Sequence, residues 1–417
     1  MNNFKSSFIN TIMSRGYFYQ CTNLESLDEI ASTDVIIGYN GCDATADSLH
    51  VGHMMQIMLL RRLQQHGHKP IIVVGGGTTK IGDPSGKDES RQILTEQQID
   101  QNIKKITPIF SKFLSFGNKT NDAIIVNNDD WLKHLNYIEF LRDYGKYFSV
   151  NRMLSFDSVK LRLDRQQPLS FLEFNYMILQ AYDFLELFRR YNCRLQMGGS
   201  DQWGNIVSGI DLAKRLEHQE LFGLCTSLLT TASGTKMGKT ASGAVWLDSE
   251  KLNPYDFWQY WRNTDDADVG KFLKLFTDIP LDEVSRLEKL PGAEINHAKI
   301  MLANAITTLV HGKDEAEKSA ETARLTFSEG KIGEALPIFE MSLSKLDHGI
   351  PAFELFKQSG LTTSNAEARR LIQGGGAKVN DEKITDEMFK ITKNFMNEDG
   401  IIKLSAGRKK HALIKVS

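Results

Sequence analysis

Two short apolar runs separated by one helical segment constrain the fold of this chain more than any other feature. Residues 35–39 (VIIGY) and 71–74 (IIVV) have the composition of buried strands. The segment between them can be capped by Asp47 or Ser48 and ends at Gly67. Its apolar residues recur at helical spacing: Met54, Met55, Met58, Leu59 and Leu63. A strand, a helix and a strand within about 40 residues form a βαβ unit, which predicts a parallel sheet.

The pattern continues through the first half of the chain. Further strands are expected near residues 124–127, 193–197 and 225–229, and helices near 170–188 and 203–216. The segment 170–188 is apolar on almost every side, which is typical of a buried helix. We therefore predict that residues 1–245 form an α/β domain with a doubly wound, Rossmann-like parallel sheet.

The second half of the chain has a different pattern. Residues 246–327 predict a small all-α domain, and the glycine- and proline-containing residues 328–348 predict a linker. Residues 349–417 predict an α+β domain: a helix over 366–373, with Ser364 and Glu367 as a capping box, precedes short strands near 377–379, 401–404 and 412–416.

Charge, cysteine content and hydropathy exclude several classes. The chain of 417 residues has 50 Lys and Arg against 52 Asp and Glu, so it is not basic as a whole. Residues 349–417 alone have 12 basic and 8 acidic residues, which hints at a polyanionic partner. No apolar stretch approaches the roughly 20 residues of a membrane-spanning helix, and the first 24 residues give only a weak case for a transit peptide. No two of the four cysteines form a C-x-x-C pair, so we expect buried thiols in a reducing compartment.

The sequence His50-Val-Gly-His53 begins the first crossover helix. The start of a helix in an α/β sheet is a natural phosphate site, because its free N–H groups and its dipole face the anion. The two histidines are three residues apart, so both can donate to that anion, and Gly52 would let a flat ring approach the backbone. The alternatives are surface histidines or two metal ligands without partners.

A second cluster, Lys236-Met-Gly-Lys239-Thr240, lies in the glycine-rich segment 232–243 after a predicted strand. A mobile cationic loop is suited to closing over a triphosphate. The cluster has one residue too few for a P-loop, and no helix pattern follows it. The alternative is a solvated basic loop.

Three polar residues lie on one face of the apolar helix: Tyr176, Gln180 and Asp183. A buried polar group without a partner costs about 1–3 kcal/mol, so these three groups need partners. A small polar ligand is one explanation, and a structural hydrogen-bond network is the other.

Glycines follow two predicted strands at the edge where open α/β sheets bind ligands. Gly198-Gly199-Ser-Asp201-Gln202 could bind a ribose through Asp201, and Gly75–Gly77 follows the strand 71–74. The loop after Gly75–Gly77 contains Asp83, Lys87 and Arg91. The alternative interpretation of this loop is a polar turn without a binding role.

Together, in this order, these segments resemble the class I aminoacyl-tRNA synthetases, and among them the bacterial-type tyrosyl enzymes. The resemblance covers essentially the whole chain. HVGH is similar to the first signature of the family, and KMGKT to the second with Gly in place of Ser. The stretches 39–50, 176–183 and 198–203 look specifically tyrosyl, whereas Asn40, Cys42 and Ala44 differ from the commonest family residues. Residues 364–375 resemble the helix-turn pattern of an S4-type RNA-binding domain.

The resemblance implies a role for each matching residue. The substrate phenol would lie against Tyr39 and Asp183, its ammonium group against Asp83, Tyr176 and Gln180, and its carboxylate against Gln202. Catalytic contacts to the phosphates would come from His50, His53, Lys87, Arg91, Lys236 and Lys239. ATP would also be bound by Gly41, Asp43, Thr45, Gly52, Gly199, Asp201 and Thr240. RNA would be bound by Arg369, Arg370, Lys378, Arg408, Lys409 and Lys410.

The resemblance also implies a reaction and its partners. The substrates would be L-tyrosine, ATP accompanied by Mg²⁺, and tRNA(Tyr), with no tightly bound cofactor and no structural metal. A cytoplasmic homodimer is expected, with residues 128–165 contributing to the interface. Two alternatives remain open: a tryptophanyl ligase, and a non-catalytic RNA-binding protein on the same scaffold.

Overall fold

The computed structural model describes residues 4–85, 93–234, 237–240, 243–326, 336–397, 399–407 and 410–416, with the backbone alone at 239–240. The chain divides into two compact units. The first comprises Met1–Thr240, Ala244–Asp248 and Thr264–Leu302, and the second comprises Ala241–Gly243, Ser249–Asn263 and Ala303–Ser417.

A six-stranded sheet forms the centre of the first unit. Its order is β1-β6-β5-β2-β3-β4, and all neighbouring pairs are parallel except β1 with β6. The strands are β1 (Gln20–Cys21), β2 (Ile37–Cys42), β3 (Lys69–Val74), β4 (Ile124–Asn127), β5 (Leu195–Gly199) and β6 (Phe222–Thr226). Strands β2, β3 and β4 follow one another toward one edge of the sheet, and β5 and β6 follow one another toward the other edge. The direction of the strand order therefore reverses between β2 and β5, which makes this position a topological switch point.

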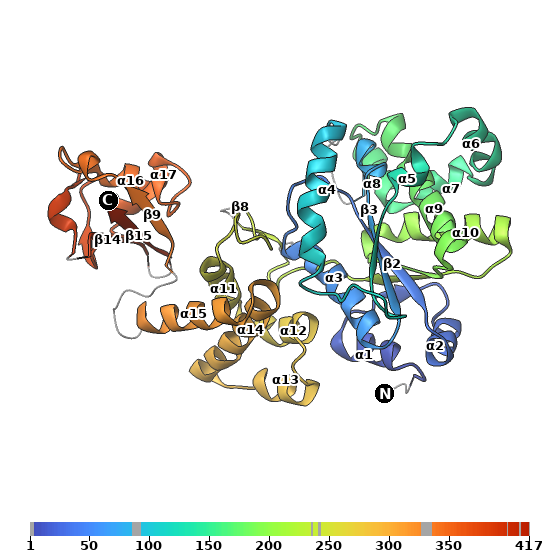
Figure 1. Cartoon of the computed structure of the whole chain (residues 1–417), viewed down its shortest axis with the longest axis horizontal. Helices are drawn as coiled ribbons and strands as arrows, with labels where there is room; N and C mark the ends of the chain where they lie inside the picture. Colours follow the sequence, from blue (N-terminus) through green and yellow to red (C-terminus); the bar gives the residue numbers. More distant parts are fainter. Residues whose placement is uncertain are drawn as a thin grey trace. The chain divides into compact units, whose positions relative to one another are not determined.

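Helices cover both faces of this sheet, as the doubly wound prediction requires (Figure 1). The long ones are α3 (Val51–Gln65), α4 (Glu96–Phe110), α9 (Phe171–Tyr191) and α10 (Trp203–Glu217). Shorter helices are α1 (Ser7–Arg15), α2 (Leu24–Thr33), α5 (Asp129–Leu132), α6 (Tyr137–Asp143), α7 (Val150–Ser155) and α8 (Asp157–Asp164). One core cluster includes buried residues of β2, β3, α9 and α10, among them Tyr39, Ile71, Phe184 and Leu212.

The predicted strands are present, with boundaries shifted by zero to three residues. The predicted cap of α3 was wrong. His50, not Asp47 or Ser48, is the N-cap, and its ring accepts a hydrogen bond from the backbone N–H of Gly52. Ser48 instead lies buried and donates its hydroxyl to the carbonyl of Leu49.

Described residues between 254 and 326 are helical where they have regular secondary structure. The helices are α11 (Pro254–Arg262), α12 (Asp266–Phe276), α13 (Leu281–Leu287), α14 (Ile295–His311) and α15 (Lys313–Arg324). Before them, β7 (Lys239–Thr240) and β8 (Gly243–Ala244) form a two-stranded ribbon. No described helix is long and apolar enough to cross a membrane.

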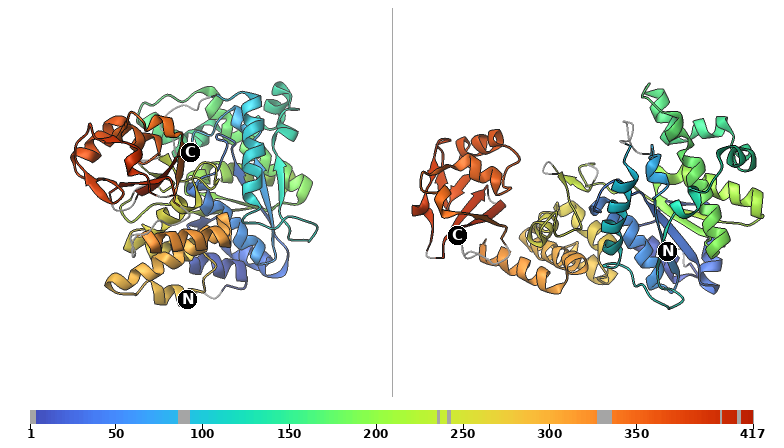
Figure 2. Two further views of the ribbon diagram at one scale, coloured as in Figure 1. Left: turned by 60° about the vertical axis from the view of Figure 1, so that its left-hand side comes forward. Right: turned by 45° about the horizontal axis from the view of Figure 1, so that its top comes forward.

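A second sheet with the order β12-β11-β14-β15-β9 lies at the end of the chain. Its strands are β9 (Ile338–Met341), β11 (Ala377–Val379), β12 (Glu382–Ile384), β14 (Ile401–Ala406) and β15 (Lys410–Val416). Helices α16 (Ala352–Gln358) and α17 (Asn365–Gln373) pack against it around one apolar core (Figure 2). The short strands β10 (Ile350–Pro351) and β13 (Lys390–Ile391) pair separately.

The prediction of a linker over 328–348 was wrong for residues 338–341, which lie in the described part of this range. Residues 338–341 form β9, which pairs in parallel with β15, so they belong to the terminal sheet. The glycines and proline that suggested a linker precede this strand. The capping box was half right: Ser364 accepts from the N–H of Glu367, but the Glu367 carboxylate accepts from Thr363.

Candidate functional site

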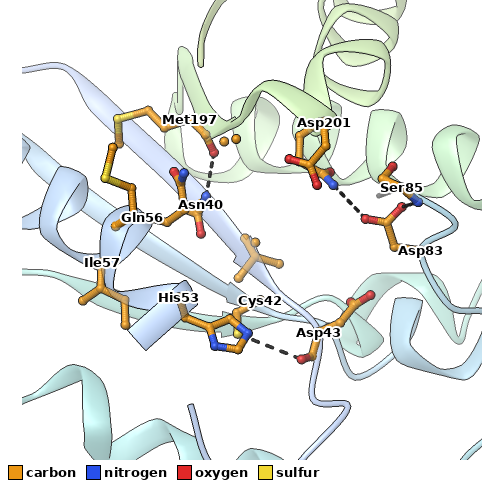
Figure 3. Close-up of a pocket in the computed structure, with 18 of the residues that line it drawn as sticks. Asn40, Cys42, Asp43, His53, Gln56, Ile57, Asp83, Ser85, Met197 and Asp201 are labelled. Atoms are coloured by element: carbon orange, nitrogen blue, oxygen red, sulfur yellow. Dashed lines mark hydrogen bonds between the residues drawn. The ribbon is translucent and has the colours of Figure 1, made fainter. Parts of the chain in front are cut away.

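A cavity of about 490 Å³ opens at the switch point, beside the carboxyl ends of β2, β3 and β5. Its lining includes residues from each segment that the sequence analysis singled out around the two signatures, the apolar helix and the strand ends: Tyr39, Asp43, His50, His53, Asp83, Tyr176, Gln180, Asp183, Asp201, Gln202 and Met237. Figure 3 shows Asn40, Gln56 and Met197 toward one end of this pocket, and Asp83, Ser85 and Asp201 toward the other.

Asp183 on α9 is a buried carboxylate at this cavity. Asn128 donates to its Oδ2 at 2.9 Å, and the indole of Trp131 donates to its Oδ1 at 2.7 Å. Burial raises the pKa of Asp183 to about 7, while these two donors act in the opposite direction and Asp43 adds to the rise. Each carboxylate oxygen still has a lone pair available to a ligand hydroxyl.

Several buried polar atoms of the cavity lining have no hydrogen-bond partner among the described residues, and two of them lie side by side on neighbouring strands. These two are the hydroxyl of Tyr39 and Oε1 of Gln196, and each side chain is only 2% exposed. Tyr39 on β2 and Gln196 on β5 are paired in register. Burial raises the pKa of Tyr39, and the nearby Asp183 adds to that rise, so the phenol is neutral and can donate. Orphaned groups of this kind are satisfied when a polar ligand binds.

Asp43 connects Tyr176 on α9 to the segment that follows β3. The hydroxyl of Tyr176 donates to Asp43 Oδ2 at 3.0 Å, and the hydroxyl of Thr78 donates to Oδ1 at 2.7 Å. A Cβ atom on Gly75 would lie 2.1 Å from Asp43 Oδ1. This glycine therefore makes room for a neighbouring side chain rather than for a ligand.

A chain of amide and carboxylate groups lines the cavity on the α9–α10 side. Gln202 donates to Asp83 Oδ2 at 2.8 Å, and Gln180 donates to Gln202 at 3.3 Å. Asn205 donates to both Gln180 and Gln202 at 3.1 Å. The predicted ammonium contacts Asp83 and Gln180 are thus brought together with Gln202, whereas Tyr176 bonds to Asp43.

The two histidines of the first signature form a reciprocal cap at the start of α3. Nδ1 of His50 accepts from the N–H of Gly52 at 3.0 Å, and Nδ1 of His53 accepts from the N–H of His50 at 3.2 Å. Because Nδ1 accepts in both rings, a neutral ring carries its proton on Nε2. Burial, with the neighbouring His50, lowers the pKa of His53 to about 3, so this ring is neutral at physiological pH.

The expectation of free N–H groups at this helix start was wrong. Val51 donates to the carbonyl of Val245 at 2.9 Å, and His53 donates to the carbonyl of His50 at 2.8 Å. The N–H of Gly52 is bonded to His50, as noted above. An anion here would meet imidazole Nε2–H groups and the helix dipole instead of backbone donors.

The second signature lies directly against the first. Gly238 has a φ of +106°, and a Cβ atom there would lie 2.9 Å from the backbone nitrogen of Gly52. Val245 donates to the carbonyl of Gly238, and Met237 donates to the carbonyl of Leu229. The glycine that replaces the usual serine is thus required by both its backbone conformation and its close contact.

The remaining predicted nucleotide contacts lie at the carboxyl ends of β2 and β5 or just after them. Thr45, Gly41, Gly199 and Asp201 all line the cavity. A Cβ atom on Gly199 would lie 2.6 Å from Asp201 Oδ1, so the glycine accommodates that carboxylate. At Gly41 an added Cβ would meet open space.

Several predicted residues lie outside the described part of the chain: Lys87, Arg91, Lys236, Arg408 and Lys409. Lys239 and Thr240 are described by their backbone in β7 only. Arg370, Lys378 and Lys410 are exposed on the terminal α+β fold. Arg369 lies over the ring of Phe353, 3.9 Å from its centroid, and 3.9 Å from Glu387.

Sequence reasoning missed Asn128 and Trp131, which hold Asp183, and the cavity residues Gln56 and Gln196. Asn128 follows the predicted strand 124–127 at the ligand-binding edge of the sheet, and this position was an available signal. Among the described residues, no group of three or more His, Cys, Asp or Glu side chains is arranged to hold a metal ion.

Comparison with known families agrees with this geometry. Residues 31–328 match the family described as tRNA synthetases class I (W and Y). The tyrosine–tRNA ligase of Caulobacter sp. (strain K31) is 57% identical over 412 residues, covering 99% of this chain and 98% of that protein. The tyrosine–tRNA ligase of Rhodopseudomonas palustris is 56% identical over 418 residues, covering 100% of both chains.

Solved structures give the same fold. A C-terminally truncated mitochondrial tyrosyl-tRNA synthetase of Aspergillus nidulans is 29% identical, with a TM-score of 0.69, and covers 77% of this chain and 94% of its own. A tryptophan-bound tryptophanyl-tRNA synthetase of Encephalitozoon cuniculi shares the fold at 15% identity, with a TM-score of 0.53, over 75% of this chain and 87% of that one. On the match over residues 31–328 and the full-length identity, this chain belongs to the class I tRNA synthetases of the W and Y group, among the tyrosine–tRNA ligases.

Proposed function

We propose that this chain activates L-tyrosine with ATP, forming tyrosyl-adenylate and pyrophosphate, and then transfers the tyrosyl group to the 3′-terminal adenosine of tRNA(Tyr). The observation that supports tyrosine most directly is the pairing of Asp183 with Tyr39. A buried carboxylate and an unpartnered buried phenol line the same cavity. Together they form a donor–acceptor pair for a substrate hydroxyl.

The same pair accounts for rejection of phenylalanine. A site built to hydrogen-bond a substrate hydroxyl rejects the analogue that lacks it, because its own polar groups are then left unpaired, an effect for which tyrosyl enzymes are the standard example. Tryptophan presents an indole N–H in place of a phenolic hydroxyl and cannot accept from Tyr39. The cavity therefore favours tyrosine over both.

In the first step, the substrate carboxylate attacks the α-phosphorus and pyrophosphate leaves. The carboxylate is already a nucleophile, so the protein contributes orientation and charge stabilisation rather than a general base. Asp83, Tyr176 and Gln180 would hold the ammonium group, and Gln202 the carboxylate. Charge on the phosphates would be met by His50 and His53 through Nε2–H, with Lys87, Arg91, Lys236 and Lys239 closing from the two loops.

The nucleotide would lie along β2, β5 and the start of α3. Gly41, Asp43, Thr45 and Gly52 would border the phosphates and the base, and Gly199 and Asp201 the ribose. Thr240 would follow Lys239 in the second signature. Mg²⁺ would accompany ATP, bound to its phosphates.

We further propose that the chain has three functional parts: a catalytic domain over 1–245, an anticodon-side helical domain over 246–327, and an S4-like RNA-binding domain toward the C-terminus. The exposed basic side chains of Arg370, Lys378 and Lys410 support RNA binding by the last part. Arg369, Arg408 and Lys409 would contribute to the same surface.

An exposed apolar surface supports a homodimer. Nine of the eighteen large apolar side chains that are exposed among the described residues lie between 137 and 172. They include Ile138, Val150 and Phe171, at 69%, 58% and 70% exposure. A concentration of this kind marks an interface. We propose that two copies of the chain associate through this surface, and that they act in the cytoplasm, where the four free cysteines would stay reduced.

Charging assays test the proposal. Purified protein, ATP and tRNA(Tyr) should yield tyrosyl-tRNA, with no product from tryptophan or phenylalanine. The variant Arg370→Ala with Lys378→Ala should lower the charging rate and leave tyrosine-dependent adenylation unchanged. Charging with tryptophan instead of tyrosine would contradict the assignment of Tyr39 and Asp183.

A further inference from the structure

Gln56 has no role in the function proposed so far, although it lines the cavity. It lies on α3 four residues after Gly52, so both residues are on the same face of the helix. The two histidines of the first signature precede it. Gln56 therefore lies further along the helix than the groups expected to meet the phosphates.

The side-chain amide of Gln56 has a hydrogen-bond partner for its nitrogen but none for its oxygen among the described residues. Its Nε2 donates at 2.8 Å to the hydroxyl of Thr226, a fully buried residue at the end of β6. Its Oε1 is buried and has no hydrogen-bond partner among the described residues. A buried acceptor without a donor costs stability, and a ligand that supplies an N–H removes this cost.

Four apolar side chains of the cavity lining lie on β5 and on segments that follow β6. Met197 on β5, Leu228 and Leu229 after β6, and Met237 line the same cavity. A Cβ atom on Gly52 would lie 2.7 Å from the ring of His50, so the flat ring that approaches this glycine is that of His50 and not, as expected from the sequence, that of a ligand. Apolar side chains together with one fixed acceptor match a purine base, whereas a phosphate would need cationic or N–H groups.

We propose that Oε1 of Gln56 accepts a hydrogen bond from the exocyclic 6-amino group of adenine, and so selects ATP over nucleotides with a 6-oxo group. Guanine and hypoxanthine present an oxygen at this position, so that two acceptors would face each other. The inference rests on the proposed function, because it assigns the base of the nucleotide consumed in adenylation. It makes Gln56 a specificity-determining residue of that site.

The test compares three nucleotides in tyrosine-dependent pyrophosphate exchange: ATP, purine riboside triphosphate, which has hydrogen in place of the amino group, and 2′-deoxy-ATP. The wild-type protein is expected to prefer ATP over the purine analogue by about tenfold in kcat/KM, equivalent to ~1.4 kcal/mol. Gln56→Met keeps the length of the side chain and removes the acceptor. In this variant the preference should fall to about onefold, with the ratio of ATP to 2′-deoxy-ATP unchanged.

Two results would overturn the assignment. If Gln56→Met lowers kcat/KM equally for ATP and the purine analogue, Oε1 does not contact the amino group. If the variant abolishes the discrimination against 2′-deoxy-ATP instead, Oε1 serves the ribose. If Gln56→Met does not fold, as judged by tyrosine binding, Gln56→Asn is used in its place, because it moves the acceptor back by one methylene group. The ratios of kcat/KM for ATP over the purine analogue and over 2′-deoxy-ATP are then measured in this variant.

Thr226→Val is the matched control for the anchoring contact. This variant frees the amide but keeps Oε1, so it should reduce the preference for ATP by less than Gln56→Met does. A larger reduction would contradict the assignment to Gln56. If wild-type protein shows no exchange with tyrosine, the proposed function fails; if it exchanges but Gln56→Met leaves the preference for ATP intact, only this inference fails.

Discussion

The indole N–H of Trp131 donates a hydrogen bond of 2.7 Å to the carboxylate of Asp183. Trp131 lies on α5, directly after β4, whereas Asp183 lies in the middle of α9. The bond, with a second one from Asn128, orients the carboxylate in the cavity and stabilises its ionised form. Residues outside the direct contact with substrate thus determine the geometry of the phenol site.

Removing this carboxylate should weaken the preference for tyrosine over phenylalanine. Hydrogen bonds to charged groups contribute about 1.5–3 kcal/mol, so Asp183→Ala should reduce the ratio of kcat/KM for tyrosine over phenylalanine by roughly 10- to 200-fold. Trp131→Phe should give a smaller reduction, because the carboxylate remains but loses one donor. The ratio is measured by pyrophosphate exchange. An unchanged ratio in Asp183→Ala would contradict the phenol assignment. Asp314→Ala, which removes an exposed carboxylate on α15, is the control.

Asp183 should also make the stability of the protein depend on pH. Its folded-state pKa, about 7, is above the ordinary value of 3.8. Between these two pH values, Asp183 is protonated more often in the folded state than in the unfolded state. Its contribution to the free energy of unfolding is therefore present at low pH and is lost as pH rises through about 7. Asp183→Asn should flatten this part of the profile, measured as urea midpoints across the window. Identical slopes in the two proteins would mean that Asp183 has an ordinary pKa.

The two nitrogens of His53 should have separable roles. Asn at this position retains an acceptor near Nδ1, and Gln retains a donor near Nε2. His53→Asn should therefore keep the helix cap but lower the rate of adenylation by roughly 10- to 100-fold, since a transition-state donor is lost. His53→Gln should keep more of the rate and lose about 1 kcal/mol of stability. Rapid-quench rates and urea unfolding distinguish the two, and the reverse pattern would contradict the assigned tautomer.

A buried ion pair supports the start of α9, the helix that positions Tyr176 and Asp183. Arg162 donates to Glu173 at 3.0 Å, and both side chains are almost fully buried. Removing one partner leaves a buried charge, so Glu173→Ala should cost about 3–5 kcal/mol of unfolding free energy. Glu321→Ala, which removes an exposed pair with Arg324, should cost about 0–1 kcal/mol. Equal losses in urea unfolding would show that burial of the first pair has no energetic consequence.

Local patterns predicted much of the fold. Five of the six strands of the main sheet were located within zero to three residues because β-branched runs and turn residues define them locally. The two-residue edge strand β1 was not predicted. The role of β9 was not predicted. Its four residues lie in a segment with linker composition, and they become a strand only through pairing with β15, which is about seventy residues away.

The polar residues of the site were predictable where they break a local rule, as Tyr176, Gln180 and Asp183 do on an apolar helix. Asn128 and Trp131 break no such rule, so their role depends on the tertiary contact between α5 and α9. The same holds for the histidines: their spacing predicts a shared face, but their reciprocal cap is set by backbone geometry. Gln56 is distinguished only by its unpaired oxygen, which no sequence pattern reveals.

The most direct test of this account is ATP–pyrophosphate exchange by the purified protein, without tRNA, in the presence of tyrosine, tryptophan or phenylalanine. We predict exchange with tyrosine alone, because only tyrosine pairs with both Tyr39 and Asp183 while its carboxylate meets the α-phosphate. Exchange with tryptophan would preserve the fold and the phosphate site but contradict the phenol pocket. No exchange with any of the three, from folded protein that still binds tRNA, would contradict the catalytic assignment itself.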